Sequence, residues 1–173
     1  MRATVFWKMI TMDQIGFLDR LIGLLEAEGI RYCVVGDQAV NAYAEPVVSL
    51  DLDLVIAVDQ LPRAETLLTA VFQVERHPHS LNLSDPGSDL RVQIQTDPRY
   101  TVFLERATTR ELLGLHLPVA AIEDVLKGKI WAATDLASRP SQRLKDLADI
   151  ARLTEAAPHL RSLVPPDVLT KLT

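Results

Sequence analysis

Apolar positions in the first third of the chain predict one helix and two short strands. Leucine and isoleucine recur at the spacing of a single helical face, at Ile15, Leu18, Ile22 and Leu25. We expect that helix to begin within residues 11–14, whose sequence is typical of a helix start, and to end at Gly29. The pattern that follows predicts a buried strand, a sharp turn at a glycine, a short helix and a second strand, over residues 31–35, 36, 37–44 and 50–58.

The rest of the chain alternates between strand and helix patterns before a helical C-terminal third. Strict alternation over residues 90–96 predicts a half-buried strand, whereas residues 82–88 have the composition of a turn. Pro62 suits the first turn of a helix with an apolar side of Leu67, Leu68 and Val71. We also expect a strand over residues 72–76, a helix over 97–106, a short edge strand over 115–119, helices over 121–133 and 140–153, and a short helical tail.

Composition limits the class of protein. The 173 residues are 48% hydrophobic and 24% charged, which is ordinary for one globular domain. The formal net charge of -5 gives no overall basic field that would attract nucleic acid. We find no apolar run long enough for a membrane span and no signal peptide in the first residues. The single cysteine, Cys33, is interpreted as a small buried hydrophobic side chain, and we expect a cytoplasmic protein.

Two carboxylates give the second strand its chemistry. Asp51 and Asp53 lie two residues apart in the otherwise apolar sequence LDLDLVIAV, so both project from one face of the strand. Unpaired negative charge is costly to bury, and a hard divalent cation such as Mg²⁺ is the natural partner. The alternative is that these aspartates merely mark a strand end. The turn at Gly36 favours the metal site, because glycine lets the backbone approach a phosphate and the next helix N-terminus attracts one.

These residues resemble the signature of the nucleotidyltransferase fold, which DNA polymerase beta, the minimal nucleotidyltransferases and the AbiEii-type toxins share. The signature consists of a strand, a pair of small residues, a short helix and then Asp-x-Asp on the next strand. It stands here as VGDQAV over residues 35–40 and DLD over residues 51–53. The chain is most similar to the small AbiEii-like group, with two departures. Asp37 replaces the second small residue, and no arginine precedes the aspartate pair, where Ser49 lies two residues ahead of Asp51.

The resemblance implies both a fold and a site. The fold is of the α/β (α+β) class, a small mixed sheet flanked by helices. Its nucleotidyltransferase core covers residues 1–119, and a helical part over residues 120–173 packs on the core as one compact unit. The implied metal ligands are Asp51 and Asp53, and the implied nucleotide-binding residues are Gly36, Asp37, Ser49 and Lys129.

The strand over residues 90–96 lacks a carboxylate that polymerase-beta-like enzymes carry beside the aspartate pair. Its polar face consists of Arg91, Gln93 and Gln95, and Gln93 is the expected counterpart of the missing group. An amide brings no charge and cannot act as a base, which weakens the case for a standard two-metal transferase. Asp89 and Asp97, at the two ends of the strand, are the remaining candidates for a third carboxylate.

The C-terminal helices resemble the end of AbiEii-like proteins, in which a lysine on one helix and an aspartate on the next belong to the active site. By this match the lysine is Lys129 and the aspartates are Asp146 and Asp149. Lys129 would then contact phosphate, and Asp146 would orient it or accept a proton. The alternative is a solvated helix face with ordinary ion pairs. An excess of basic residues over 127–152 agrees with a phosphate-facing surface.

The order of these motifs predicts a nucleotidyltransferase that uses a nucleoside triphosphate and Mg²⁺ or Mn²⁺. Its expected catalytic residues are Asp51, Asp53, Lys129 and Asp146. The acceptor stays open between RNA, a protein and a small molecule, and the AbiEii resemblance implies a toxin–antitoxin role with an antitoxin partner. Asp37 and the missing third carboxylate favour an alternative, a catalytically degenerate nucleotide-binding or protein-interaction module on the same fold.

Overall fold

The computed structural model describes residues 16–173. Its helices are α2 (Phe17–Ala27), α3 (Gly36–Tyr43), α4 (Leu61–Thr69), α5 (Phe103–Arg106), α6 (Ile122–Thr134), α7 (Pro140–Ala156) and α8 (Pro166–Leu169). Its strands are β1 (Tyr32–Val35), β2 (Asp51–Ile56), β3 (Gln73–His77), β4 (Ser80–Ser84), β5 (Arg91–Gln95), β6 (Thr108–Leu112) and β7 (Leu115–Val119). Short 3-10 segments are η1 (Val58–Gln60), η2 (Pro98–Tyr100), η3 (Pro158–Leu163) and η4 (Thr170–Leu172). The expected helix start at residues 11–14, and Ile15 with it, lies outside the described residues.

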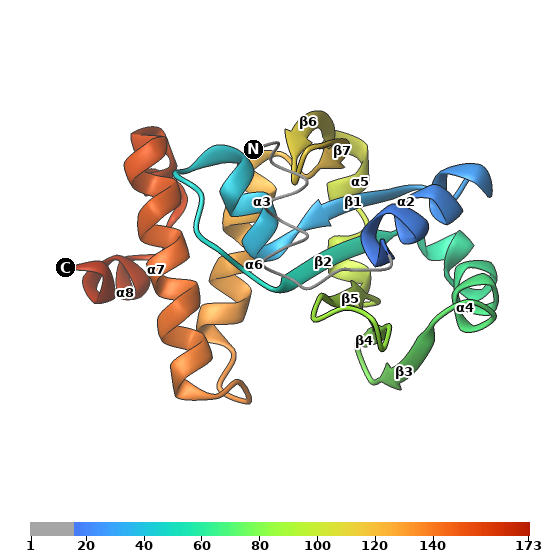
Figure 1. Ribbon diagram of the computed structural model, residues 1–173. Helices are drawn as coiled ribbons and strands as arrows, with labels where there is room; N and C mark the ends of the chain where they lie inside the picture. The colour runs from blue at the N-terminus through green and yellow to red at the C-terminus, as the bar shows by residue number, and fades with distance from the viewer. Residues whose placement is uncertain (1–15) are drawn as a thin grey trace.

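The strands form one mixed sheet with β2 at its centre. Among the described residues the strand order is β3-β4-β5-β2-β1-β7-β6. β2 is antiparallel to β1 and parallel to β5, and β1 is parallel to β7. The hairpins β3–β4 and β6–β7 extend the sheet at its two edges. Figure 1 shows α3, α6 and α7 gathered at one end of the molecule and α2 and α4 at the other.

The core is built on α2 and on the apolar central strands. Phe17, Leu18 and Leu21 of α2 are fully buried, and the ring of Phe17 lies 5.0 Å from that of Phe72. All four residues of β1 are buried, including Cys33, and burial raises the pKa of the Cys33 thiol to about 12. This thiol therefore stays protonated at neutral pH and packs as a small hydrophobic side chain, as the sequence predicted.

Most of the expected elements are confirmed. The predicted strands over residues 31–35, 50–58 and 90–96 correspond to β1, β2 and β5, and the predicted C-terminal helices correspond to α6 and α7. On β5 the alternation holds, because Val92 and Ile94 are buried whereas the polar residues between them are not. Of the described helices, none is long and apolar enough to cross a membrane.

Three expectations were wrong. Ser80–Ser84 forms β4, where the sequence suggested that a turn begins at residue 82, because Leu81 and Leu83 alternate into the core between polar neighbours. β7 is not an edge strand, because β6 pairs along it from outside through a tight turn. Leu113 and Gly114 both have positive φ in that turn, 56° and 76°, which suits a two-residue hairpin. Val71 lies beyond the end of α4 and is exposed, while Ala64 is buried in its place.

Candidate functional site

A cleft of about 1360 Å³ opens along the face of the sheet that carries the aspartate pair. Strands β2 to β5 contribute to its floor, and η2, α6 and the α6–α7 connection contribute to its wall. Asp51 and Asp53 both line the cleft, whereas Leu52 and Leu54 between and after them are fully buried. The two carboxylates therefore share the cleft face of the central strand, as the alternation predicted.

Gly36 joins β1 to α3 in a conformation that strongly favours glycine. Its φ is +69°, in the left-handed region that a side chain disfavours. A Cβ atom at this position would lie 2.9 Å from Asp53 Cγ and 3.0 Å from Asp53 Cβ, closer than real contacts allow. The glycine thus leaves bare backbone beside Asp53, at the N-terminus of α3, where a phosphate group could approach.

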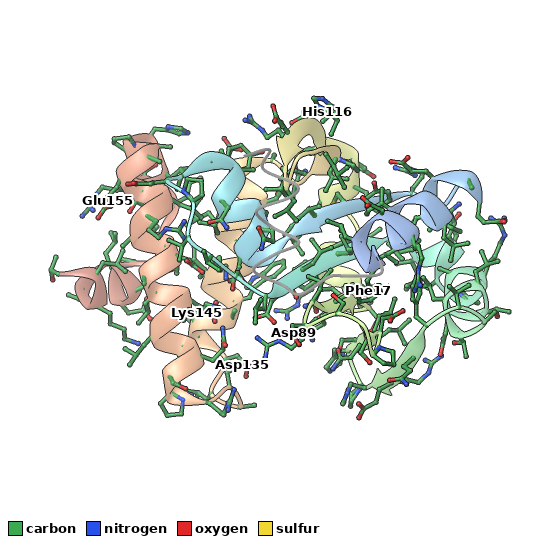
Figure 2. The ribbon with its side chains drawn as sticks, in the orientation of Figure 1. Phe17, Asp89, His116, Asp135, Lys145 and Glu155 are labelled. Atoms are coloured by element: carbon green, nitrogen blue, oxygen red, sulfur yellow. The ribbon has the colours of Figure 1, made fainter. Side chains whose placement is uncertain are left out.

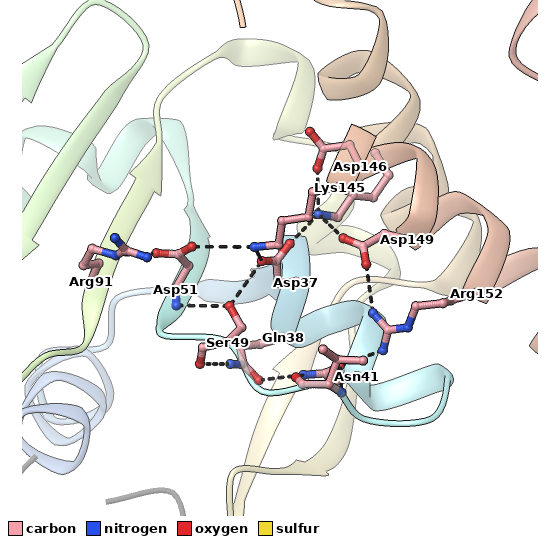
Figure 3. Close-up of polar contacts among 12 residues, drawn as sticks. Asp37, Gln38, Asn41, Ser49, Asp51, Arg91, Lys145, Asp146, Asp149 and Arg152 are labelled. Atoms are coloured by element: carbon pink, nitrogen blue, oxygen red, sulfur yellow. Dashed lines mark hydrogen bonds and ion pairs between the residues drawn. The ribbon is translucent and has the colours of Figure 1, made fainter. Parts of the chain in front are cut away.

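Asp37 does not project a free negative charge into the cleft. It is buried in the first turn of α3, with Oδ1 2.5 Å from Lys129 Nζ and Oδ2 2.5 Å from Lys145 Nζ (Figure 3). The Ser49 hydroxyl also donates to Oδ2, at 3.2 Å. Burial alone would raise the pKa of Asp37, but the two lysines hold it well below its usual range. Two ammonium groups therefore neutralise the charge that was expected to repel a triphosphate.

Lys129 lies inside a cage of three carboxylates. Its Nζ is 2.5 Å from Asp37, 3.0 Å from Asp146 and 2.8 Å from Asp149, and its side chain is only 6% exposed. Burial disfavours the charged form, yet the three carboxylates raise the pKa of Lys129 above its ordinary value. One oxygen of each carboxylate lies within 4.8 Å of the others, a spacing that would suit a metal ion. The ammonium already occupies that place, so the cage is an ion-pair network joining α3, α6 and α7.

Lys145 is far more accessible than Lys129, and sequence reasoning did not include it in the site. It lies on the side of α7 that faces α6 and the sheet (Figure 2). Its Nζ is 2.5 Å from Asp37 and 4.0 Å from Asp51 Oδ2, and its side chain is 46% exposed. It therefore connects the glycine turn to the aspartate pair. The sequence placed it only among the basic residues of one helix, with no signal that the helix faces β2.

Asp51 has a second cationic neighbour, Arg91, and its backbone N–H donates a hydrogen bond to Ser49. Arg91 Nε donates to Asp51 Oδ1 at 2.7 Å. Ser49 Oγ accepts a hydrogen bond from the Asp51 backbone at 3.2 Å, and the Ser49 side chain is buried and does not line the cleft. In this conformation Ser49, which was predicted to bind nucleotide, holds Asp37 and Asp51 in place.

The strand beside the aspartate pair carries no carboxylate at the matching position. β5 pairs in parallel with β2, and Gln93 lies opposite Asp53 in that register, where the sequence placed it. Of the two flanking carboxylates, Asp97 lines the cleft but accepts hydrogen bonds from Arg99, and Asp89 does not line it. A third carboxylate is therefore not brought to the aspartate pair from β5.

The aspartate pair has the donor chemistry of a divalent metal site. Burial, together with the charges of Asp37 and Asp51, raises the pKa of Asp53 to about 7, although Lys129 opposes the shift. The raised pKa means that the cations near Asp53 do not fully balance the charge of its carboxylate. Carboxylate oxygens are the ligands that Mg²⁺ and Mn²⁺ prefer, and the residues present fit such an ion.

The basic residues of the C-terminal helices do not form one phosphate-facing surface. Lys129 is enclosed in its cage, and Arg143 donates to the backbone oxygen of Ser138. Arg152 donates to Asp149 Oδ1 at 2.8 Å and also to Asn41 Oδ1 at 2.9 Å. Among these basic residues, Lys129, Lys145 and Arg152 fix the C-terminal helices on α3.

Neither a protein-family model nor a curated protein matches the sequence. Solved structures do match the fold. One is the crystal structure of ANT(2'')-Ia in complex with adenylyl-2''-tobramycin. The match covers 92% of this chain and 99% of that chain, with a TM-score of 0.61 and 11% sequence identity. The lincomycin-bound lincosamide antibiotic adenylyltransferase LnuA covers 79% of this chain with 96% of its own, with a TM-score of 0.54 and 13% identity.

A third similar structure is an antigenic nucleotidyltransferase-like protein from Paracoccidioides brasiliensis. It covers 96% of this chain with 91% of its own, with a TM-score of 0.51 and 18% identity. The match extends over nearly all of the chain, including the C-terminal helices, at identities too low to carry a substrate or a residue role. The chain has the α/β nucleotidyltransferase fold, a mixed sheet flanked by helices.

Proposed function

We propose that the protein transfers a nucleotidyl group from a nucleoside triphosphate to an acceptor, with Mg²⁺ or Mn²⁺ as cofactor. The observation that carries the proposal is the contact between Gly36 and Asp53. It brings bare backbone at a helix N-terminus against Asp53, which faces the cleft together with Asp51. Phosphate and metal sites then adjoin, which nucleotidyl transfer requires.

Each residue of the site has a separate role in this proposal. Asp51 and Asp53 would hold the metal ion, which neutralises charge on the phosphates as pyrophosphate leaves. Gly36 allows the triphosphate close to the backbone. We assign the phosphate contact to Lys145, because it is exposed and lies between Asp37 and Asp51. Lys129, which the sequence suggested for this role, also lines the cleft, but it would have to leave three carboxylates to reach a phosphate.

Other parts of the hypothesis rest on the sequence motifs, on the Lys129 cage or on the similar structures. We propose that residues 120–173 close over a core of residues 1–119, and that Asp146 acts through Lys129 and Asp37 to hold the glycine turn. Kinship with the AbiEii-like group, a toxin–antitoxin role with an antitoxin partner and a cytoplasmic location are proposed on the motif resemblance. A small-molecule acceptor is favoured over RNA or protein, because two of the similar structures contain lincomycin and adenylyl-2''-tobramycin.

A second candidate function is a nucleotide-binding module that has lost its chemistry. The observation in its favour is Gln93, which occupies the position opposite Asp53 where a third carboxylate would act. An amide there can orient a ligand but cannot accept a proton. This candidate predicts nucleotide binding without turnover.

A thermal-shift titration with each nucleoside triphosphate tests both candidates. A ligand that binds the folded state raises the unfolding midpoint. We expect a rise with Mg²⁺ and a triphosphate in the wild type, and none in Asp51→Asn/Asp53→Asn. Release of labelled nucleoside monophosphate or labelled acceptor from an α-labelled triphosphate then separates the transferase from the binding module. No shift at millimolar triphosphate would refute both.

A further inference from the structure

Strand pairing places four polar residues in one line across the floor of the cleft. Asp53 on β2 pairs with Gln93 on β5, Gln93 pairs with Asn82 on β4, and Asn82 pairs with Glu75 on β3. All four line the cleft. Adjacent strands lie about 4.8 Å apart, so this polar row leads from the aspartate pair toward the edge of the sheet over about 14 Å. Each of the four strands β2, β5, β4 and β3 contributes one residue to it.

The two middle members of the polar row are neutral amides with open hydrogen-bonding capacity. Gln93 and Asn82 are both half-buried. Within the part of the chain that the structure describes, no group hydrogen bonds to the Gln93 side chain. Asn82 receives one long bond, from Ser80 Oγ at 3.4 Å. These two side chains therefore present hydrogen-bond donors and acceptors to a molecule that lies in the cleft.

The charges around the polar row indicate what kind of molecule fits. Two arginines that line the cleft are paired, Arg91 with Asp51 and Arg99 with Asp97. The carboxylates of the polar row, Asp53 and Glu75, lie at its two ends, and its two middle members carry no charge. Each amide offers one acceptor and two donors, which matches ligand groups that both donate and accept, chiefly hydroxyls.

An aromatic cluster in the wall of the same cleft complements this polar floor. The rings of Tyr100 and Trp131 are 5.3 Å apart, and the Arg99 guanidinium lies 4.5 Å from the centre of the Trp131 ring. Burial raises the pKa of Tyr100, and the charge of Asp53 adds to the shift, so this wall lies within electrostatic reach of the aspartate pair. A molecule with hydroxyls at its edges and apolar faces contacts both surfaces favourably.

We infer that the acceptor is a polyhydroxylated molecule, which binds along the polar row with its reacting hydroxyl at the Asp53 end. This inference rests on the proposed function and names its acceptor. The hydroxyl oxygen forms a bond to the α-phosphorus of the triphosphate, and the bond from that phosphorus to the bridging oxygen of pyrophosphate breaks. Pyrophosphate leaves with the electron pair. The hydroxyl proton passes to water in the cleft, because Gln93 cannot take it. Gln93 and Asn82 bind the acceptor.

The test compares acceptors and variants in one assay. Label transfer from α-labelled ATP with Mg²⁺ is measured to maltotriose, to spermine and to a short oligouridylate. The variants are Gln93→Leu and Asn82→Leu. Gln93→Ala is included as a second variant at residue 93, in case leucine at that position disturbs folding. The matched control is Gln95→Leu, which changes the same residue type on the same strand and face, one step outside the polar row. Binding of Mg²⁺ and ATP is followed separately by thermal shift.

We expect transfer to maltotriose and not to the other two probes. Loss of one neutral hydrogen bond lowers the specificity constant for maltotriose about 3- to 10-fold in Gln93→Leu and in Asn82→Leu. Gln95→Leu should stay within about twofold of the wild type by the same scale, and the ATP-induced shift should be unchanged in all variants.

Two results would overturn the inference while leaving the proposed function standing. One is transfer to spermine, to the oligouridylate or to water alone. The other is row variants that behave like Gln95→Leu. A wild type that shows no shift with Mg²⁺ and any nucleoside triphosphate would instead remove the proposed function itself, and the acceptor assignment with it.

Discussion

Gly36 lies so close to Asp53 that a Cβ atom on Gly36 would be 2.9 Å from the carboxyl carbon of Asp53. The turn and the aspartate pair are therefore one structural unit. Gly36→Ala should lower the free energy of unfolding by about 1–2 kcal/mol from the left-handed φ alone, and by more if Asp53 must move. It should also abolish the thermal shift that Mg²⁺ and a triphosphate produce.

Gly23→Ala is the matched control for that substitution. Gly23 lies inside α2, and an added Cβ there meets nothing within 4 Å. Replacing glycine by alanine in a helix should stabilise the protein by about 0.5–1 kcal/mol. Equal behaviour of the two variants in urea denaturation would show that the turn does not depend on glycine.

Lys129→Met should be the most destabilising change in the site. It leaves Asp37, Asp146 and Asp149 facing one another in a buried space without their shared cation. Breaking a buried ion-pair network by removing one partner typically costs about 3–5 kcal/mol. Urea denaturation at neutral pH measures the loss. Lys127→Met, on an exposed position of the same helix, should change the stability little, and a similar result for Lys129→Met would contradict the cage.

Lys145→Met should separate binding from stability. The side chain is 46% exposed, and Asp37 keeps Lys129 as a partner when Lys145 is removed, so we expect less than about 1 kcal/mol of destabilisation. The shift produced by Mg²⁺ and inorganic tripolyphosphate should fall strongly, because the phosphate contact is lost. Lys145→Arg keeps the positive charge and should therefore restore part of the thermal shift. Wild-type affinity of Lys145→Met for tripolyphosphate would exclude the phosphate role.

Asp53→Asn should stabilise the metal-free protein above neutral pH. The pKa of Asp53 is raised to about 7, so between about pH 4 and 7 the folded state holds a proton that the unfolded state has lost. Stability therefore falls as the pH rises through this window and stays lower above it. The variant does not lose this stability, so its free energy of unfolding should exceed that of the wild type by about 1–3 kcal/mol at pH 8. At about pH 4 the two free energies of unfolding should be equal.

Urea denaturation of both proteins across this pH range, with and without Mg²⁺, measures the effect. Saturating Mg²⁺ should stabilise the wild type at pH 8 and not the variant, because the ion supplies the missing counter-charge at Asp53. A difference between the two proteins that does not change with pH would mean that Asp53 is not the titrating group.

The sequence by itself determined the local elements and the most distinctive motif. Apolar patterning located α2 and the central strands, because side chains that face one core must repeat at the period of their element. The spacing of Asp51 and Asp53 fixed their common face for the same reason. Gly36 was identifiable because a sharp turn before a helix needs a residue without Cβ.

The tertiary structure alone decided which of these groups meet. Lys145 approaches Asp37 across 108 positions of sequence, Lys129 is enclosed by residues of two helices, and Asp53, Gln93, Asn82 and Glu75 align through strand register. Such contacts depend on how elements pack, which local patterns do not encode. The sequence did not predict the strands β4 and β6. Both strands are stabilised by pairing with their neighbours in the sheet rather than by a hydrophobic pattern of their own.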